Sequence, residues 1–517
     1  MDKDRKVCYN NTITHINVRG HDMKLYLVNH DQRYAAEQML LTLFPEERPE
    51  YPHAPTDGDC AVLTLSRGAQ NATVTCRLRR VGKTALGRAA VPIAALTDDQ
   101  TEGRLISRAV KRAFYHAALQ LGVKKPVWGA LTGVRPGKLM EKLLLEGCTD
   151  AQALRRFRGE FDVSPERAAL CLETAHATLA AAETLSEKDV CLYIGIPFCP
   201  TRCAYCSFVS QSVEKSMKLI QPFFDALLRE VEATAQAVQE AGLRCVSLYL
   251  GGGTPTTLSA QQLDALFQKL EERFSGADLR EITVEAGRPD TITEDKLRVL
   301  RRHNVGRISV NPQTMDDRVL DVIGRRHSAQ DIVDALALTR EVGGFAVNMD
   351  LIAGLPGDTT EGFCRTIDRV LELCPENITV HTLSRKRGSS LSENEAPLPS
   401  AEDVSAMLDY AAEKLAGAGY APYYLYRQKF MSGGFENVGW TKPGFENLYN
   451  ICIMEELCSI LAMGGGASTK LVAPGGRIRR SFDPKYPKEY IENIDRICAE
   501  KSAICDWFSS TQEGAAT

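Results

Sequence analysis

The stretch Tyr193-Ile-Gly-Ile-Pro-Phe-Cys199-Pro-Thr-Arg-Cys203-Ala-Tyr-Cys206 places three cysteines close together, directly after a short apolar run that is typical of a β-strand. Thiolates this near in sequence can converge on one metal centre, and soft sulfur ligands suit zinc or an iron–sulfur cluster. A structural zinc ion takes four protein ligands, as does a closed 4Fe–4S cluster, whereas three thiolates leave one iron open to a cofactor or substrate. The number of cysteines therefore favours an open iron–sulfur site. A zinc site without its fourth ligand, or core cysteines that meet by chance, are the alternatives.

Length and composition indicate a globular protein of more than one domain. The chain has 517 residues, of which 44% are hydrophobic and 25% are charged, with a formal net charge of −4. This length predicts two or three domains, and the charge does not favour a nucleic-acid partner. We see no apolar run near the roughly 20 residues of a membrane helix, and the first residues do not resemble a signal peptide. We therefore expect no membrane span and a cytoplasmic location.

The chain contains sixteen cysteines. Because disulfides are rare in the reducing cytoplasm, these cysteines are not expected to form a disulfide framework. Most of them, such as Cys76 and Cys245, lie in apolar patterns and are expected to be small buried side chains. Only Cys199, Cys203 and Cys206 form a tight group along the sequence.

Hydrophobic patterns divide the chain into three predicted regions. Residues 1–188 are expected to form an α+β accessory domain, which includes a hairpin of strands 60–65 and 72–81. Residues 189–392 alternate between strands and amphipathic helices, and residues 393–517 are expected to form a smaller region that covers the substrate.

The central region predicts an α/β fold with a parallel sheet. Strands are expected at Cys191–Ile196, Cys245–Leu250, Glu281–Ala286, Arg307–Val310, Ala346–Ile352 and Asn377–Leu383. Alternation of strands and helices implies right-handed crossovers between parallel strands. Six units are fewer than the eight of a closed barrel, so we expect a partial (β/α)6 three-quarter barrel. Its chemistry should collect at the carboxyl ends of the strands.

A glycine-rich segment, Gly251-Gly-Gly-Thr-Pro-Thr256, follows the second predicted strand. Consecutive glycines allow positive φ angles and let a ligand approach the bare backbone. A tight turn without a ligand is the alternative for this segment on its own.

Together, residues from Tyr193 to about Pro356 resemble the oxygen-independent coproporphyrinogen III oxidase family of radical S-adenosylmethionine (SAM) enzymes. The shared patterns are Tyr-x-x-Ile-Pro-Phe-Cys, Gly-Gly-Gly-Thr-Pro-Thr, Val-Glu-Ala, Gln, Gly-Arg and Asp-Leu-Ile-x-Gly-Leu-Pro-Gly. The N-terminal region, Arg135-Pro-Gly-Lys138 and Tyr423-Tyr-Leu-Tyr-Arg-Gln-Lys429 resemble the coproporphyrinogen dehydrogenase (HemZ-type) subgroup.

The resemblance implies a cofactor site at defined positions. Cys199, Cys203 and Cys206 would hold a 4Fe–4S cluster whose open iron binds SAM. Glu285 would hold the methionine end of SAM, Gln313 and Asp350 the ribose hydroxyls, and Arg325 the carboxylate. Further positions that would line the SAM site are Tyr193, Tyr205, Gly252, Gly253 and Thr254. No catalytic residue beyond the cluster and the SAM site is implied.

Basic residues mark a candidate substrate site. Arg385, Lys386 and Arg387 follow the last predicted barrel strand, and Arg427 lies further along the chain. At the barrel mouth these residues could bind the carboxylates of an acidic substrate. A solvated loop is the alternative interpretation.

The resemblance implies a cytoplasmic enzyme of porphyrin and haem biosynthesis. It would convert propionate side chains of coproporphyrinogen III to vinyl groups with loss of carbon dioxide. A flavodoxin- or ferredoxin-type protein would supply the electron that cleaves SAM. Two alternatives stay open: a haem-binding chaperone of the same family, and a radical methyl transfer or ring opening on a tetrapyrrole.

Overall fold

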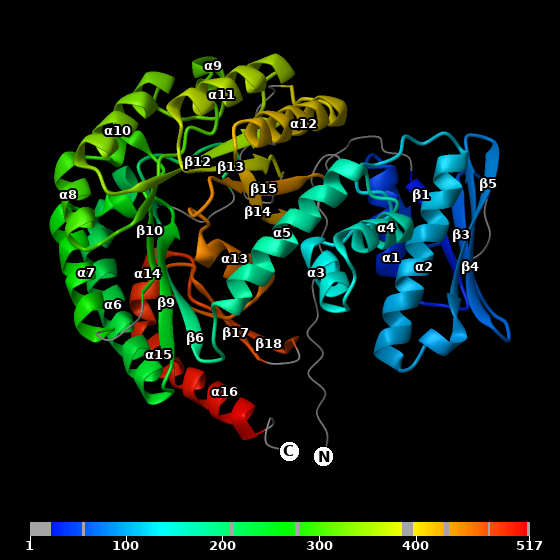
Figure 1. Cartoon of the computed structure of the whole chain (residues 1–517), viewed down its shortest axis with the longest axis horizontal. Helices are drawn as coiled ribbons and strands as arrows, with labels where there is room; N and C mark the ends of the chain where they lie inside the picture. Colours follow the sequence, from blue (N-terminus) through cyan, green and yellow to red (C-terminus); the bar gives the residue numbers. More distant parts are fainter. Residues whose placement is uncertain are drawn as a thin grey trace. The chain divides into compact units, whose positions relative to one another are not determined.

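The computed structural model describes residues 22–53, 57–206, 211–274, 279–384, 397–428, 434–473 and 476–513 (Figure 1). The chain forms two compact units, Met1–Thr132 and Gly133–Thr517. Among the residues described, none of the helices is both long enough and apolar enough to cross a bilayer.

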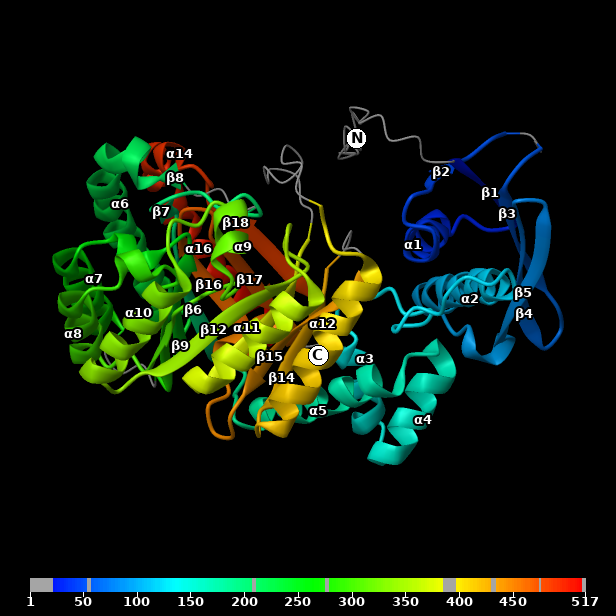
Figure 2. The ribbon, with the colours of Figure 1, turned by 90° about the horizontal axis from the view of Figure 1, so that it is seen from above.

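The first unit is a five-stranded sheet packed against two helices. Its strand order is β2 (Arg48–Glu50), β1 (Asp22–Val28), β3 (Cys60–Arg67), β4 (Asn71–Arg80) and β5 (Lys83–Pro92). Figure 2 shows α1 (Arg33–Leu43) and α2 (Asp99–Gln120) on the same side of this sheet. The antiparallel pairing of β3 with β4 confirms the predicted hairpin. A Cβ at Gly87 of β5 would meet the Ala113 carbonyl oxygen of α2 at 2.0 Å, so the helix can approach this strand only at a glycine.

The second unit contains an eleven-stranded sheet whose central strands are parallel. All six predicted barrel strands are present: β6 (Asp189–Ile196), β9 (Arg244–Gly252), β10 (Glu281–Glu285), β11 (Arg307–Ser309), β12 (Ala346–Ala353) and β13 (Asn377–Thr382). Each pairs in parallel with the next. This pairing confirms the predicted α/β fold with a partial (β/α)6 barrel.

Helices between the parallel strands form an arc outside the sheet (Figure 1). They are α6 (Val213–Glu240), α7 (Ala260–Arg273), α8 (Glu294–Arg302), α10 (Ala329–Val342) and α11 (Thr360–Leu373). Ser259 and Ser328 each begin a helix with a capping box, in which the side chain accepts from the third helical backbone N–H. Short α9 (Asp317–Val322) lies between β11 and α10 along the chain.

Residues after 393 extend the same sheet at both edges. On one edge, β15 (Glu436–Thr441) pairs antiparallel with β13, and β14 (Ala421–Arg427) pairs with β15. On the other edge, β16 (Ser459–Gly464) runs parallel to β6 and is followed by antiparallel β17 (Ser468–Val472) and β18 (Ile478–Phe482). The C-terminal region predicted for residues 393–517 therefore shares its sheet with the barrel. Its helices are α12 (Ala401–Gly417), α13 (Leu448–Glu455), α14 (Pro487–Glu492), α15 (Ile494–Glu500) and α16 (Ser502–Glu513).

Three helices that lie within the predicted N-terminal region belong to the second unit: α3 (Gly137–Leu145), α4 (Asp150–Phe161) and α5 (Pro165–Glu183). Buried Arg167 of α5 pairs with Asp409 of α12 and with Glu436 of β15. Lys138 of the Arg135-Pro-Gly-Lys138 motif donates to Glu456 at 2.9 Å. These ion pairs connect α3 and α5 to the C-terminal region, and the boundary between the compact units falls after residue 132 rather than at residue 188.

Candidate active site

A cavity of about 460 Å³ lies at the carboxyl ends of the parallel strands. This is the edge of the sheet at which a barrel presents its chemistry. The lining includes every residue that the sequence predicts for the cluster and for SAM: Tyr193, Cys199, Cys203, Tyr205, Cys206, Gly252, Gly253, Thr254, Glu285, Gln313, Arg325 and Asp350. The fold thus brings together residues that span more than 150 positions of the sequence.

Cys199, Cys203 and Cys206, here named the loop triad, lie on the segment that follows β6. Cys199 belongs to the two-residue strand β7 (Phe198–Cys199), which pairs with β8 (Gln211–Ser212). The Cys206 N–H donates to the Cys203 carbonyl at 3.1 Å, which closes a turn around the last two cysteines. Cys203 is buried, whereas Cys199 and Cys206 are partly exposed. The loop therefore presents three thiols to the cavity from a backbone that is already folded.

The glycine segment packs directly against this loop. Gly252 has a φ of 106°, and a Cβ at Gly253 would lie 2.5 Å from the Phe198 carbonyl oxygen. The N–H groups of Gly253 and Thr254 donate to the carbonyls of Ile196 and Phe198, both at 2.7 Å. The Thr254 hydroxyl donates to the Cys199 sulfur at 3.5 Å. A side chain at Gly253 would push the two segments apart, which explains why glycine is needed there.

Arg325 is a buried cation at the cavity wall. Its Nη1 donates to the Asn311 carbonyl at 2.6 Å and its Nη2 donates to the Tyr205 hydroxyl at 3.2 Å. Its Nε is buried and has no hydrogen-bond partner within the part of the chain that the structure describes. The neighbouring Arg326 is exposed. Burying a guanidinium among neutral groups costs free energy unless an anion pairs with it. Arg325 is therefore suited to binding a carboxylate ligand.

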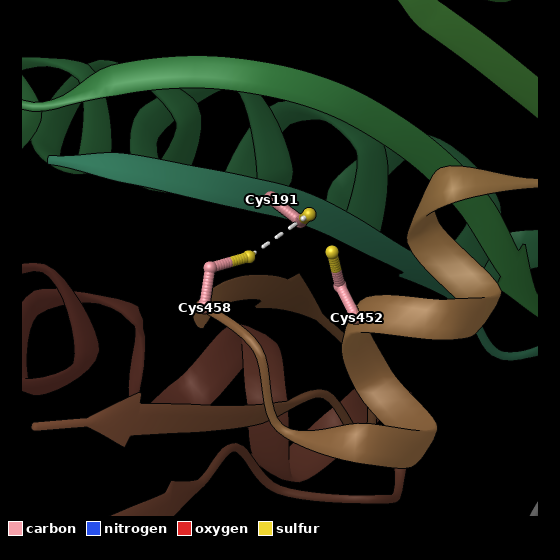
Figure 3. A group of neighbouring side chains, drawn as sticks. All are labelled: Cys191, Cys452 and Cys458. Carbon is pink, nitrogen blue, oxygen red and sulfur yellow. Dashed lines mark hydrogen bonds between the residues drawn. The ribbon is translucent and has the colours of Figure 1, made fainter. Parts of the chain in front are cut away.

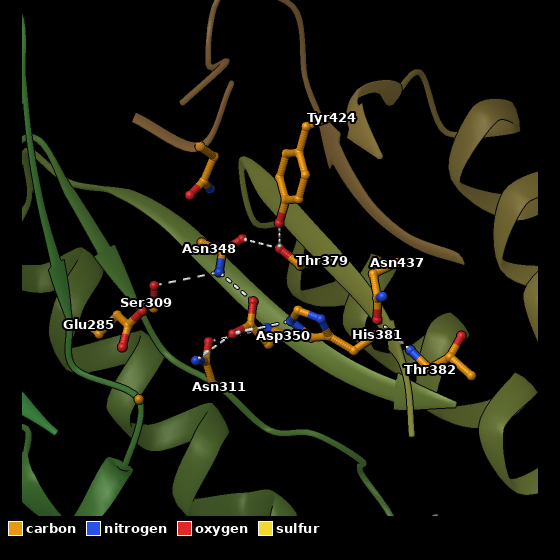
Figure 4. A network of polar contacts seen from close by, with 12 residues as sticks. Glu285, Ser309, Asn311, Asn348, Asp350, Thr379, His381, Thr382, Tyr424 and Asn437 are labelled. Atoms are coloured by element: carbon orange, nitrogen blue, oxygen red, sulfur yellow. Dashed lines mark hydrogen bonds and ion pairs between the residues drawn. The ribbon is translucent and has the colours of Figure 1, made fainter. Parts of the chain in front are cut away.

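Asp350 sits at the centre of a polar network on β11, β12 and β13 (Figure 4). Asn311 donates to its Oδ2 and Asn348 donates to its Oδ1, each at 2.8 Å. The Nε2 of His381 lies 3.9 Å from Oδ2. Burial alone would raise the pKa of Asp350, but the interaction with His381 and the hydrogen bond from Asn348 hold it below its ordinary value. Asp350 is therefore an ionised acceptor at the cavity wall.

Glu285 has the opposite electrostatic environment. Burial, followed by the negative charge of Asp350, raises the pKa of Glu285 to about 7, although the Tyr249 hydroxyl donates to its Oε1 at 2.7 Å. Two carboxyl groups in one cavity thus differ in ionisation near neutral pH. A cationic ligand group beside Glu285 would favour its charged form.

Gln313 occupies a strained position just beyond β11. Its φ is 67°, in the left-handed region that non-glycine residues seldom adopt. Its N–H donates to the Asp350 carbonyl at 2.9 Å, and its carbonyl accepts from Ile352 N–H at 3.0 Å. These bonds to β12 fix the backbone and hold the side chain at the cavity.

Several cavity residues were not predicted from the sequence, and Arg288, Asn311 and His381 are among them. Arg288 is 3% exposed, and it donates to the Cys203 sulfur at 3.5 Å and to the Thr201 hydroxyl at 2.9 Å. Each of the three is a polar residue within or just after a predicted apolar strand. A polar residue at the end of an apolar strand was therefore the available sequence signal. It indicates a shared site only when the ends of these strands are known to lie together.

The predicted substrate residues have different outcomes. Arg427 does not line the cavity: its guanidinium donates to the Gly434 carbonyl from Nε at 2.8 Å and from Nη2 at 2.6 Å. Burial lowers the pKa of Arg427 to about 10. Its geometry thus supports a role in holding the chain after β14, in place of the predicted substrate contact. Arg385, Lys386 and Arg387 lie outside the described residues, although Ser384 just before them lines the cavity.

Comparison with known proteins identifies the family. A family model described as the Radical SAM superfamily matches residues 193–370. The oxygen-independent coproporphyrinogen-III oxidase-like protein HemZ of Bacillus subtilis is 40% identical over 380 residues, which cover 72% of this chain and 76% of that protein. The chain belongs to this radical SAM family. The resemblance found in the sequence motifs is thereby confirmed.

Further relatives of this radical SAM protein differ in their named activity. The haem chaperone HemW of Haemophilus influenzae is 30% identical over 304 residues, covering 58% of this chain and 75% of that protein. Among solved structures, the radical SAM coproporphyrinogen III oxidase HemN of Escherichia coli shows 25% identity and a TM-score of 0.49, covering 66% of this chain and 82% of that chain.

Radical SAM proteins as a class use a 4Fe–4S cluster and SAM, and the cavity offers groups that fit both. Three thiols face it from one loop, and glycines 252 and 253 leave the backbone bare where a side chain would clash. The buried Nε–H of Arg325, without a partner among the described residues, can donate a hydrogen bond to an anion. The donor set therefore matches the cofactors of the family.

Proposed function

We propose that this protein is a radical SAM enzyme that oxidatively decarboxylates propionate side chains of coproporphyrinogen in porphyrin biosynthesis. The observation that carries the proposal is the convergence of the loop triad, the glycine segment, Arg325 and Asp350 on one cavity at the strand ends. The 40% identity to a coproporphyrinogen oxidase-like protein supports the choice of substrate.

In this proposal the loop triad holds the 4Fe–4S cluster and the neighbouring residues hold SAM. Arg325 meets the SAM carboxylate, Glu285 the methionine end, and Gln313 and Asp350 the ribose hydroxyls. Tyr193, Tyr205, Gly252, Gly253 and Thr254 complete the lining of the SAM site. When bound, the two cofactors supply the one-electron chemistry that removes a hydrogen atom from an unactivated carbon.

In this proposal the side chains of the protein bind and orient SAM and offset the charge of the cluster ligands. The planar fork of Arg325 can meet a carboxylate through two charge-assisted bonds, while its contacts with Asn311 and Tyr205 fix its direction. Arg288 places a second positive charge beside the Cys203 sulfur, where it offsets the negative charge of thiolate ligands. Asp350 stays ionised and accepts hydrogen bonds from hydroxyl groups.

Beyond the proposed SAM residues, the cavity wall offers rings and hydrogen-bonding groups. Tyr424, Tyr426, His381 and Gln428 line it, and the Tyr426 hydroxyl lies 3.5 Å from Nδ1 of His381. Aromatic faces with polar edges suit a flat macrocycle whose rim carries polar groups. Arg385, Lys386 and Arg387 remain the predicted partners of the propionates. A flavodoxin- or ferredoxin-type donor and a cytoplasmic location likewise remain predictions.

The test is product analysis under anaerobic conditions. Full-length protein is reconstituted with iron and sulfide and incubated with coproporphyrinogen III, SAM and a chemical reductant. We expect a tetrapyrrole that has lost carbon dioxide and gained a vinyl group, and no such product from the Cys203→Ala variant. An unchanged tetrapyrrole in the presence of SAM cleavage contradicts the proposed substrate. A methylated or ring-opened product assigns a different radical reaction to the same cavity.

A second candidate function is haem binding as a chaperone, which the similarity to HemW favours. It is separated from the first by adding haem to the reconstituted protein and removing free haem by gel filtration. Stable binding of about one haem per chain, without any vinyl product from coproporphyrinogen III, supports the chaperone. Turnover of coproporphyrinogen III without stable haem binding supports the enzyme.

A further inference from the structure

A second group of three cysteines lies in the core of the barrel unit. Cys191 belongs to β6, Cys452 to α13, and Cys458 comes directly before β16; this group is named the core triad. Figure 3 shows the three sulfur atoms pointing toward one another. All three lie within 4.8 Å of each other, and the sulfur atoms of Cys191 and Cys458 are 3.5 Å apart.

The environment of the core triad is apolar. Cys191 and Cys452 are 0% exposed and Cys458 is 6% exposed. Val246, Ile460 and Tyr449 pack around them. Ser247 is the strand partner of Cys191, and its buried hydroxyl has no hydrogen-bond partner within the described chain. Adjacent strand partners share a face of the sheet, so this hydroxyl lies on the side of the core triad.

The number and spacing of the thiols point to a metal ion. A disulfide uses two cysteines and leaves the third without a role. One ion with thiolate ligands at about 2.3 Å holds its sulfur atoms about 4 Å apart, close to the separations in the core triad. No other cysteine, histidine or carboxylate joins this group among the residues that the structure describes. Soft three-sulfur surroundings select thiophilic ions over oxygen-loving ones.

We propose that the core triad binds a single thiophilic metal ion, monovalent copper or divalent zinc, separate from the iron–sulfur site of the loop triad. Binding forms metal–sulfur bonds, and the displaced thiol protons leave to solvent without a change in oxidation state. Monovalent copper needs no ligand beyond the three sulfur atoms. Zinc takes a fourth ligand, for which the Ser247 hydroxyl is the protein atom in place.

The position of the core triad gives this ion a structural role. Cys452 lies three residues after Tyr449 on α13, and Cys191 lies two residues before Tyr193 on β6. The rings of Tyr193 and Tyr449 stack with a centroid distance of 6.1 Å, and both residues line the cavity. An ion shared by β6, α13 and the start of β16 would therefore fix one wall of the cavity.

The experiment uses the full chain with Cys199, Cys203 and Cys206 all changed to Ser, so that the loop triad cannot bind the added metal. This protein is titrated anaerobically with copper(I) or zinc against a competing chelator and examined by native mass spectrometry. We expect one ion per chain. X-ray absorption of the loaded protein should show a shell of three sulfur atoms at about 2.3 Å.

A variant pair isolates the core triad. Adding Cys452→Val should lower the affinity for the ion at least tenfold, whereas adding Cys245→Val, which changes another buried cysteine on β9, should leave it unchanged. Adding Ser247→Ala identifies the ion: a tenfold weaker zinc affinity with unchanged copper affinity shows a four-coordinate zinc site. Binding that survives Cys452→Val overturns the proposal.

Three further outcomes do not depend on the folding of the core variants. Absence of ion binding by the chain with the three serine substitutions overturns the proposal. So does an intact mass two hydrogens lower, with a Cys191–Cys458 disulfide in the peptide map, because the group would then be an oxidisable pair. Conversely, the bound ion should protect Cys191, Cys452 and Cys458 from alkylation in mild denaturant, and no protection contradicts the assignment.

Discussion

The loop triad and the core triad contain the same three side chains, yet the fold assembles them in different ways. The loop triad lies within a single loop at the cavity, and two of its cysteines are partly exposed. The core triad combines a strand, a helix and the start of another strand, and all its members are buried. The loop triad is open to a ligand in the cavity. The core triad is closed to the solvent and suited to a structural ion.

The comparison also separates two kinds of sequence information. Spacing along the chain reveals the loop triad, because its members need only a local turn to converge. The core triad depends on the parallel pairing of β16 with β6, which joins residues more than 250 positions apart. The spacing of Cys191, Cys452 and Cys458 along the sequence does not predict that strand pairing.

The largest expected difference between the triads is in iron content. After anaerobic reconstitution, the parent should hold about four irons per chain, and Cys203→Ala should lose nearly all of them because an open cluster needs all three thiolates. Cys452→Ala should keep its iron, because the core triad is not a cluster ligand set. Iron and sulfide assays on the folded fraction measure this. Loss of iron from Cys452→Ala with retention in Cys203→Ala would reverse the two assignments.

The next largest effect is expected at Arg325, beside the loop triad. Arg325→Lys keeps the charge and loses the planar fork, so SAM affinity should fall by about 1–3 kcal/mol, or roughly 5- to 150-fold. Arg326→Lys is the matched control, because that neighbour is exposed. Equilibrium binding by calorimetry gives both values. A greater loss at position 326 would place the carboxylate contact one residue further along.

A smaller effect is the pH dependence of SAM binding. Glu285 has a pKa of about 7 in the protein without ligand, so its carboxyl group is largely neutral below that pH. The positively charged methionine end of SAM favours the ionised carboxylate, so affinity should rise up to about tenfold per pH unit below 7 and level off above about 8. Glu285→Gln should remove the dependence. A flat profile in the parent would mean that Glu285 does not meet a cationic group.

The smallest effect concerns Arg288, whose Nη1 lies 3.5 Å from the Cys203 sulfur. Arg288→Gln removes a positive charge beside the loop triad, so the cluster should become harder to reduce, with a potential shifted on the order of tens of millivolts to more negative values. Exposed Arg298→Gln on α8 is the control and should cause no shift. Spectroscopic redox titration measures both. An unchanged potential for Arg288→Gln would show that the charge does not reach the cluster.

How much could be predicted from the sequence depends on whether a signal is local. The six barrel strands followed from apolar runs separated by amphipathic helices, and the residues expected to hold SAM followed from the resemblance of motifs at the strand ends to the radical SAM family. Glu285, Gln313, Arg325 and Asp350 were all placed at positions that the fold brings to one cavity.

Features that depend on distant pairing were missed. β15 and β16 add to the barrel sheet through β13 and β6, which lie far away in sequence, and their apolar patterns do not specify those partners. Arg288 and His381 can be recognised as cavity residues only when the neighbouring strand ends are known to lie together. Arg427 illustrates the reverse case: a basic residue in a tyrosine-rich segment suggested a substrate contact, whereas its guanidinium binds backbone carbonyls.

Formation of 5′-deoxyadenosine tests most directly the central claim that the loop triad carries SAM chemistry. The reconstituted parent, Cys203→Ala and the buried-cysteine control Cys245→Ala are compared with SAM and a reductant, and the product is measured by liquid chromatography. The account predicts product from the parent and from Cys245→Ala at similar rates, and only background from Cys203→Ala. Product from Cys203→Ala at the parent rate would contradict it.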